Sequence, residues 1–361
     1  MKIISKYIAR KFWGPFFFIF CIFAALIFLA DSIEKLRWTS TYSVSLWSVL
    51  KYTLMTMPDF LMQVLPAVCL LSALLVISDM IAAGEWTACL AGGFTVRQIF
   101  KPLIACIVLV AAFGFLAQAF FVPFLSLRSE VFYEREIKRN KDWSFNVEND
   151  VTLRLDGRRV LFAKILRPEA GQMEGMFIDS YDEGWALASQ ISARNFRWDA
   201  ARRAWVFEDG VIRRFGKNAT LEETPFNTLL SDYAVPPQDI SVGGMEGALL
   251  SVPALIKRIE FLETSGLSAY KEHTLLHTRL AAPFAAVIMC LLGMPLAIAL
   301  KRSSKILNIV CAVAIGFGFW WIVSILSSAG QSGMLNPALA GWLPVAVFAA
   351  VAWAEFKILK I

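Results

Sequence analysis

The sequence has 361 residues, of which 57% are hydrophobic and only 18% are charged. Soluble globular chains are about half apolar and about a quarter charged, so this composition excludes an ordinary soluble protein. The net charge of +6 is divided between short connections and forms no basic stripe interleaved with aromatic residues, which argues against nucleic-acid binding.

The first third of the chain contains three long uncharged runs, Phe12–Ala30, Phe60–Ser78 and Pro102–Leu127. A helix needs about 20 apolar residues to cross the hydrocarbon core of a membrane, so each run predicts one span. No small-residue cleavage site follows the first run, which favours a retained span over a cleaved signal peptide.

A long polar segment follows, with the pattern of short β-strands. Apolar residues alternate on both sides of Asp156-Gly157 in "VTLRLDGRRVLFAKIL", and Asp209-Gly210 separates "AWVFE" from "VIRRF". Both dipeptides are typical hairpin turns, so we expect an all-β sandwich or jelly roll. The stretch "SVPALIKRIEFLETSG" then predicts a short amphipathic helix, with Ser251 as its N-cap and Gly266 at its end.

The last third contains two more uncharged runs, Leu280–Leu300 and Ile306–Ala354. The second run is long enough for two spans, and its glycines and Pro337 favour a turn near the middle. The predicted fold is therefore a membrane protein with six transmembrane helices and a β domain between the third and fourth. The predicted domains are residues 1–127 (three spans), 128–271 (β domain and linker helix) and 272–361 (three spans).

Basic residues orient these spans. They collect at the N-terminus, in the second and fourth connections and at the C-terminus, which all lie on one side of a six-span chain. Because Lys and Arg favour the cytoplasmic side, we expect both termini in the cytoplasm and the β domain outside. The residues concerned are Lys2, Lys6, Arg10, Lys11, Arg97, Lys101, Lys301, Arg302, Lys305, Lys357 and Lys360.

Motifs for catalysis are missing from the sequence. It has no GxxxxGK[ST], HExxH, GxSxG or CxxC, so we expect no ATP hydrolysis and no other enzymatic activity from this chain. His273 and His277 have a spacing that suits metal binding, but no third ligand accompanies them, and two interfacial histidines are the favoured interpretation. Asp79 and Glu85 lie near or beyond the end of the second span, which argues against intramembrane catalysis.

Three blocks of the sequence together resemble the LptF/LptG permease family, the membrane subunits of the lipopolysaccharide export ABC transporter. The blocks are "MKIISKYIARKFWGPFFFIF", "QVLPAVCLLSALLVISDM" with the following "GEWTACLAGGFTVRQI", and "SVPALIKRIEFLETSGLSAYKEHTLLHTRLAAPF". The resemblance covers nearly the whole chain, and "DSIEKL" at the end of the first span favours the LptG side of the pair.

The resemblance implies a permease subunit that extracts lipopolysaccharide from the bacterial inner membrane and passes it to a periplasmic bridge. It implies an LptB-like cytoplasmic ATPase dimer, an LptF-like permease, and LptC-like and LptA-like bridge proteins as partners. This chain would bind no cofactor, because the ATPase would use the ATP and magnesium. Moving an acyl chain of a dozen methylenes out of the bilayer costs on the order of 10 kcal/mol, so extraction needs such a fuelled partner.

The connection after the second span is the predicted site of coupling to that ATPase. We expect a cytoplasmic coupling helix near residues 78–93, and the resemblance implies that Glu85 pairs with a basic residue of the ATPase. Gly84 and Ala88 would allow close approach, Gly92 would end the helix, and Arg97 would lie beside it.

The outer end of the first span is the predicted site for lipopolysaccharide phosphates. The resemblance assigns this role to Lys35 and Arg37, although neighbouring acids such as Asp31 would compete for them. The apolar faces of the first and fifth spans are expected to line an acyl-chain cavity. The residues assigned to these faces are Phe20, Phe23, Ile27, Phe317 and Trp321, with Gly316 and Gly318 permitting close helix approach.

A non-transporting membrane receptor or scaffold is the main alternative, in which the outer β domain binds a ligand. The coupling-like helix favours transport, because a receptor would more often carry a cytoplasmic signalling domain. A membrane-embedded enzyme is disfavoured by the lack of clustered acids, bases or metal ligands within the spans.

Overall fold

A computed structural model describes residues 2–139, 148–154, 158–167, 172–200, 202, 204–215, 221–231, 247–264, 268–300 and 305–358. The chain forms two compact units. The first comprises Met1–Lys138 and His273–Ile361, and the second comprises Arg139–Glu272. The predicted turn at Asp156-Gly157, the helix end at Gly266 and the basic pair Lys301 and Arg302 lie outside the described residues.

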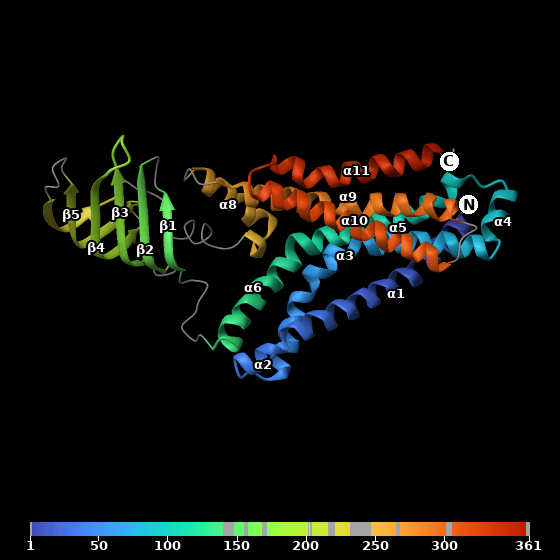
Figure 1. Cartoon of the computed structure of the whole chain (residues 1–361), viewed down its shortest axis with the longest axis horizontal. Helices are drawn as coiled ribbons and strands as arrows, with labels where there is room; N and C mark the ends of the chain where they lie inside the picture. Colours follow the sequence, from blue (N-terminus) through green and yellow to red (C-terminus); the bar gives the residue numbers. More distant parts are fainter. Residues whose placement is uncertain are drawn as a thin grey trace. The chain divides into compact units, whose positions relative to one another are not determined.

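The first unit is helical, and its described residues contain six helices that are long and apolar enough to cross a membrane, which confirms the predicted number. The N-terminal end of α1, the C-terminal end of α11 and the short α4 lie at one end of this unit (Figure 1). Its elements are α1 (Lys2–Lys35), α2 (Arg37–Thr41), α3 (Leu46–Ala82), α4 (Glu85–Ala91), α5 (Val96–Leu116), η1 (Ala117–Phe121), α6 (Val122–Phe132), η2 (Tyr133–Ile137), α9 (Tyr270–Ala299), α10 (Lys305–Gln331) and α11 (Pro337–Ile358).

Side-chain caps and glycines set the ends of these helices. The hydroxyl of Ser45 accepts from the backbone N–H of Ser48 at 3.2 Å and starts α3. Thr95 and Gln98 form a capping box at the start of α5, in which each side chain accepts from the other residue's backbone N–H. Gly333 has a left-handed φ of 78° in the connection between α10 and α11, where the sequence predicts a turn.

The third span continues as a helix beyond the uncharged run that predicted it. The run ends at Leu127, but the helix reaches Ile137 through two π-helical turns, η1 and η2. Glu134 in this extension has a cationic partner, because Lys138 donates to it at 2.6 Å. An uncharged run therefore marks the apolar part of a helix and not its end.

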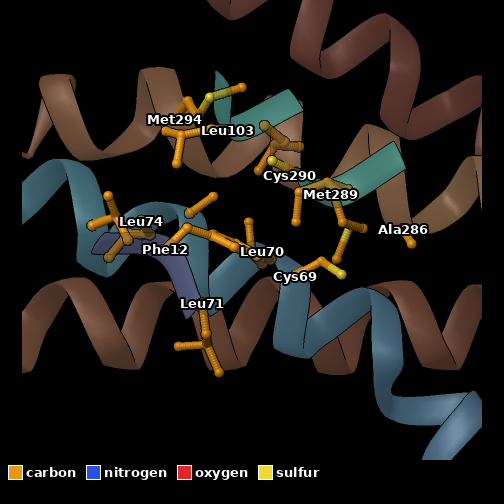
Figure 2. Packing of buried hydrophobic residues seen from close by; sticks show 14 of the residues in the cluster. Phe12, Cys69, Leu70, Leu71, Leu74, Leu103, Ala286, Met289, Cys290 and Met294 are labelled. Carbon is orange, nitrogen blue, oxygen red and sulfur yellow. The ribbon is translucent and has the colours of Figure 1, made fainter. Parts of the chain in front are cut away.

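The core of the helical unit lies where α3 and α9 meet. Side chains of Cys69, Leu70 and Leu74 on α3 lie opposite Met289 and Cys290 on α9 (Figure 2), and all five are buried. Helices in a membrane associate through close packing and not through removal of apolar surface from water. Small residues are therefore needed where two backbones approach.

Gly293 is a small residue at a close approach of two helix backbones. A Cβ atom at this position would lie 2.7 Å from the backbone oxygen of Leu70 and 3.0 Å from its Cδ1. Only glycine leaves room for α9 to approach α3 this closely. Gly316 on α10 has a milder role, since a Cβ there would lie 3.1 Å from the Cβ of Ala67.

The second unit contains one antiparallel sheet, whose six described strands follow each other in sequence order. The β domain is therefore confirmed, and its described strands form a meander without the crossing connections of a jelly roll. The strands are β1 (Glu148–Arg154), β2 (Arg159–Arg167), β3 (Gln172–Tyr181), β4 (Leu187–Asp199), β5 (Ala204–Phe215) and β6 (Leu221–Leu230). A 3-10 turn, η3 (Gly247–Leu249), and the predicted helix, α8 (Val252–Thr264), complete the unit.

The predicted hairpin turn at Asp209-Gly210 is wrong, because both residues lie inside β5. Gly210 pairs with Ala193 on β4 and with Phe226 on β6. A Cβ on Gly210 would come within 2.3 Å of the Phe226 ring, so the glycine provides the space that this ring occupies. Asp209 adopts a left-handed φ of 53° without interrupting the register.

Candidate functional site

The connection between α3 and α5 contains a separate short helix, α4. The helical segment expected near residues 78–93 is thus divided, because Ser78–Ala82 complete α3 and Gly84 interrupts the helix with a φ of 73°. On α4, the Trp86 side chain is buried and its ring lies 6.1 Å from that of Phe100 on α5. Packing through Trp86 therefore holds α4 against the helical unit.

Glu85, the first residue of α4, has two partners on α1. Its Oε2 accepts from Lys11 Nζ at 2.7 Å, and its Oε1 accepts from the hydroxyl of Tyr7 at 2.9 Å. The Lys11 ammonium also donates to the Tyr7 hydroxyl at 3.5 Å. The hydrogen bond from Lys11 lowers the pKa of Glu85 below its usual 4.5, so the carboxylate is ionised at neutral pH.

Sequence reasoning missed Lys11 and Tyr7 as partners of Glu85. The two residues are four apart, so they share a face of α1, and the lysine lies within a segment long and apolar enough to be a span. Both facts were readable from the sequence. The N-terminal lysines were interpreted only as orienting charge, and the sequence alone does not indicate which distant segment that face meets.

The other residues predicted for coupling take different positions around α4. Ala88 is exposed on the helix, and Arg97 is exposed in the first turn of α5. Gly92 caps α4, with its N–H bonded to the carbonyl of Ala88 at 2.9 Å. At Gly84, a Cβ would meet no atom of the described residues within 4 Å, so within this chain it is the left-handed conformation that favours glycine, and close approach to an ATPase stays a prediction.

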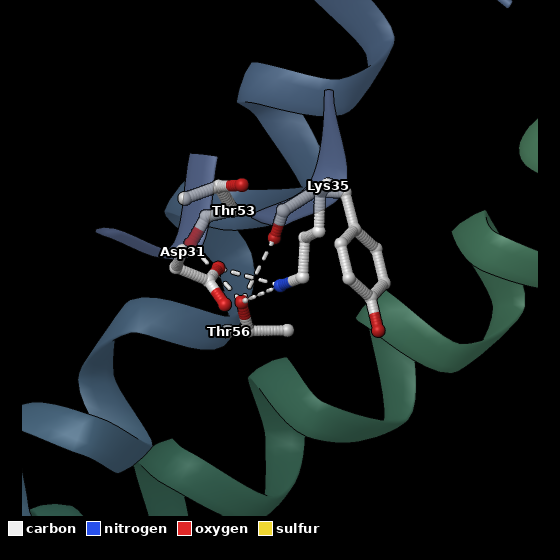
Figure 3. A network of polar contacts seen from close by, with 5 residues as sticks. Asp31, Lys35, Thr53 and Thr56 are labelled. Carbon is white, nitrogen blue, oxygen red and sulfur yellow. Dashed lines mark hydrogen bonds and ion pairs between the residues drawn. The ribbon is translucent and has the colours of Figure 1, made fainter. Parts of the chain in front are cut away.

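The C-terminal end of α1 contains a second polar cluster, centred on Lys35 (Figure 3). Its ammonium lies 2.5 Å from a carboxylate oxygen of Asp31 and 3.3 Å from the hydroxyl of Thr56 on α3. The same ammonium lies 4.5 Å from the centre of the Tyr52 ring. The Lys35 side chain is only 12% exposed, so this lysine is held by an ion pair within α1 and by a hydrogen bond to α3.

Aromatic rings surround this cluster. The rings of Trp38, Tyr52 and Tyr133 lie 5.0 to 5.5 Å from one another and join α2, α3 and the end of the third span. Arg37, the other predicted phosphate ligand, differs from Lys35 because it is exposed at the start of α2. No acidic side chain pairs with Arg37 in the part of the chain that the structure describes.

The two apolar faces predicted to bind lipid differ in exposure. Phe20 and Phe23 on α1 pack partly against the helical core, and Ile27 is half-buried. Phe317 and Trp321 on α10 are 64% and 66% exposed. The main described neighbours of α1 are α3 and α5 and those of α10 are α3 and α11, so both helices pack on α3, and the acyl-chain cavity stays a prediction.

A buried polar group inside the helical unit was not predicted. Asp59 on α3 accepts from Gln63 at 3.2 Å, is hydrogen-bonded to Gln118 of η1, and attracts Arg279 on α9 electrostatically. Arg279 is only 5% exposed. Asp59 and Arg279 each lie directly beside an uncharged run from which a span was predicted. This position at the edge of a run was the feature of the sequence that could have indicated the polar group.

His277, one of the two predicted histidines on α9, lies at a close contact with α11. A Cβ on Gly341 of α11 would lie 2.8 Å from both the backbone carbon and the Cβ of His277. The two helices therefore touch at His277. Among the described residues, no group of three or more His, Cys, Asp or Glu side chains is placed to hold a metal ion.

Comparison with known proteins agrees with this architecture. The sequence matches the family described as "Lipopolysaccharide export system permease LptF/LptG" over residues 6–357. It is 20% identical over 358 residues to the lipopolysaccharide export system permease protein LptG of Escherichia coli K12, covering 96% of this chain and 95% of that one. It is also 20% identical over 367 residues to LptG of Haemophilus influenzae, covering 97% of each chain. This chain belongs to the LptF/LptG family of lipopolysaccharide export permeases.

Proposed function

We propose that this chain is an LptG-like permease subunit of an ATP-driven transporter that extracts lipopolysaccharide from the bacterial inner membrane. The observation that carries the proposal is the family match over residues 6–357, which includes all six helices and the β domain. Both termini would lie in the cytoplasm and the β domain in the periplasm, as the distribution of basic residues favours. The chain would work with an ATPase dimer, a paralogous permease and periplasmic bridge proteins.

The decisive experiment is reconstitution of the complex in liposomes that contain lipopolysaccharide. We expect ATP-dependent release of lipopolysaccharide to a soluble bridge protein, and no release when this chain is omitted. The receptor alternative predicts that the chain purifies from its membrane in mild detergent without a bound ATPase. Release that does not depend on this chain would contradict the proposed function.

Coupling to the ATPase is assigned to α4 and to Glu85. A carboxylate offers about four acceptor positions, and Lys11 and Tyr7 occupy two of those on Glu85. The side chain is 31% exposed, so a basic residue of the ATPase can reach a remaining position. Such a shared carboxylate would join the ATPase to α4 and α1 at one point.

Substitution of Glu85 tests this assignment. Glu85→Lys is expected to reduce co-purification of the ATPase while the protein still inserts in the membrane. Lys6→Glu is a suitable control, because it reverses the charge of an exposed α1 residue without touching α4. Wild-type recovery of the ATPase with Glu85→Lys would show that Glu85 does not contact it.

Lipopolysaccharide phosphates are assigned to the outer end of α1. Arg37 is exposed and is free to form charge-assisted hydrogen bonds with a phosphate, whereas Lys35 would first have to leave Asp31. A photocrosslinking residue at position 37 should therefore give more lipopolysaccharide adduct than one at position 35. The absence of adducts at both positions would contradict this assignment.

A further inference from the structure

The polar contact described between α4 and α1 depends on one residue of α4. Both described hydrogen bonds between these helices end on Glu85, one from Lys11 and one from Tyr7. The next residue of α4, Trp86, is buried in the hydrophobic core to which Ile8 of α1 also belongs, and its ring lies near that of Phe100 on α5. Loss of the Lys11 contact would therefore keep the apolar packing of Trp86 and remove the ion pair that binds α4 to α1.

On either side of α4, a glycine with a left-handed backbone conformation interrupts the helix. Gly84 and Gly93 have left-handed φ angles of 73° and 83°, so α4 continues neither α3 nor α5 as a helix. A push on α4 would rotate these short connections before it moved the neighbouring helices. Side-chain contacts must therefore transmit part of any displacement of α4.

The beginning of α1 is suited to receive this displacement. Ile8 and Phe12 are fully buried on the same part of α1 that holds Tyr7 and Lys11. The helix then runs without interruption to Lys35, where the ion pair with Asp31 contacts α3 near Thr56. One helix thus connects the Glu85 contact with the cluster at its C-terminal end.

We propose that Lys11 and Tyr7 are positioning residues that bind α1 to α4 through Glu85, so that α1 follows α4 during the transport cycle. This inference rests on the proposed coupling role of α4. In this inference the intramolecular ion pair acts after the ATPase has docked. Its function is to help convert ATP hydrolysis into movement of α1.

The test uses the whole complex in liposomes and compares Lys11→Gln with Lys6→Gln, a matched change at an exposed lysine of the same helix. Three quantities are measured: recovery of the ATPase, ATP hydrolysis, and lipopolysaccharide released per ATP hydrolysed. We expect Lys11→Gln to keep the ATPase bound and to release several-fold less lipopolysaccharide per ATP. Lys11→Arg, which keeps the charge, should restore most of this ratio.

Two results would overturn the inference. One is a release per ATP with Lys11→Gln that equals that of Lys6→Gln. The other is loss of the ATPase from the Lys11→Gln complex, which would make the ion pair part of the docking site. If Lys11→Gln does not insert, Tyr7→Phe serves instead, since it removes one hydroxyl and should lower the ratio in the same direction.

Failure of the proposed function gives a different result. In that case the wild-type complex itself shows no ATP-dependent release. Failure of the inference leaves the wild-type complex active and makes Lys11→Gln indistinguishable from its control.

Discussion

Replacing Gly293 with alanine should separate α9 from α3. The new Cβ would lie 2.7 Å from the Leu70 backbone oxygen. Carbon–oxygen contacts are ordinarily no shorter than about 3.3 Å, so the helices must move apart by about 0.6 Å. A backbone oxygen cannot change rotamer, and the displacement therefore extends to the surrounding core.

The energetic effect follows from this geometry. Overpacking of a core costs about 1–3 kcal/mol, and the better helix propensity of alanine offsets about 0.5–1 kcal/mol. We therefore expect Gly293→Ala to lower the free energy of unfolding by about 1–2 kcal/mol. Gly318→Ala is the matched control, because a Cβ there meets no atom of the described residues within 4 Å, and it should be neutral or slightly stabilising.

Buried thiols provide the assay. Cys69 and Cys290 are 0% and 1% exposed beside this contact, so a thiol-reactive dye reports their exposure as the protein is heated in detergent. A difference of about 2 kcal/mol between the two variants corresponds to about 4–8 °C in Tm. Equal Tm values for Gly293→Ala and Gly318→Ala would refute the close-approach argument.

Three further predictions concern other parts of the chain. Gly210→Ala should destabilise the β domain by about 1–3 kcal/mol, because its Cβ would overlap the neighbouring ring, and limited proteolysis of the full chain would detect it. Arg279→Met should lower the Tm, because Asp59 would lose the positive charge that attracts it, and adding Asp59→Leu should recover part of the loss in a thermal assay. The pKa of Glu85 is lowered in the folded state, so the ion pair stabilises above the unfolded pKa and is lost as pH falls through the folded value. The stability difference between wild type and Glu85→Gln should thus stay constant from about pH 8 to about pH 5 and shrink below about pH 4.

The fold was predictable where one physical rule dominates. Long uncharged runs indicate spans because charge is excluded from hydrocarbon, and Phe60–Ser78 lies within α3 as expected. The turn prediction failed at Asp209-Gly210 because Asp-Gly is also compatible with a strand when a ring from the next strand covers the glycine. That ring belongs to Phe226, and only the tertiary structure brings it there.

The sequence predicted which types of residue form the candidate sites, but not which of these residues pair with each other. The sequence indicated an acid at the start of a short helix and cations at the end of the first span. It did not indicate that Glu85 meets Lys11, or that Lys35 is already bound to Asp31. Pairing depends on which helix faces meet, and 3.6-residue periodicity describes one helix at a time.

The two π-helical turns of the third span have a consequence for the direction of its side chains. A π turn contains one residue more than an α turn, and one residue corresponds to about 100° of rotation around the axis. A helical wheel drawn through Val96–Ile137 as a single α-helix would therefore misplace Val122–Phe132, which follow the first π turn, by about 100°. Deleting one residue from Ala117–Phe121 should rotate Tyr133 away from Trp38 and Tyr52, although every residue of the aromatic group would be retained.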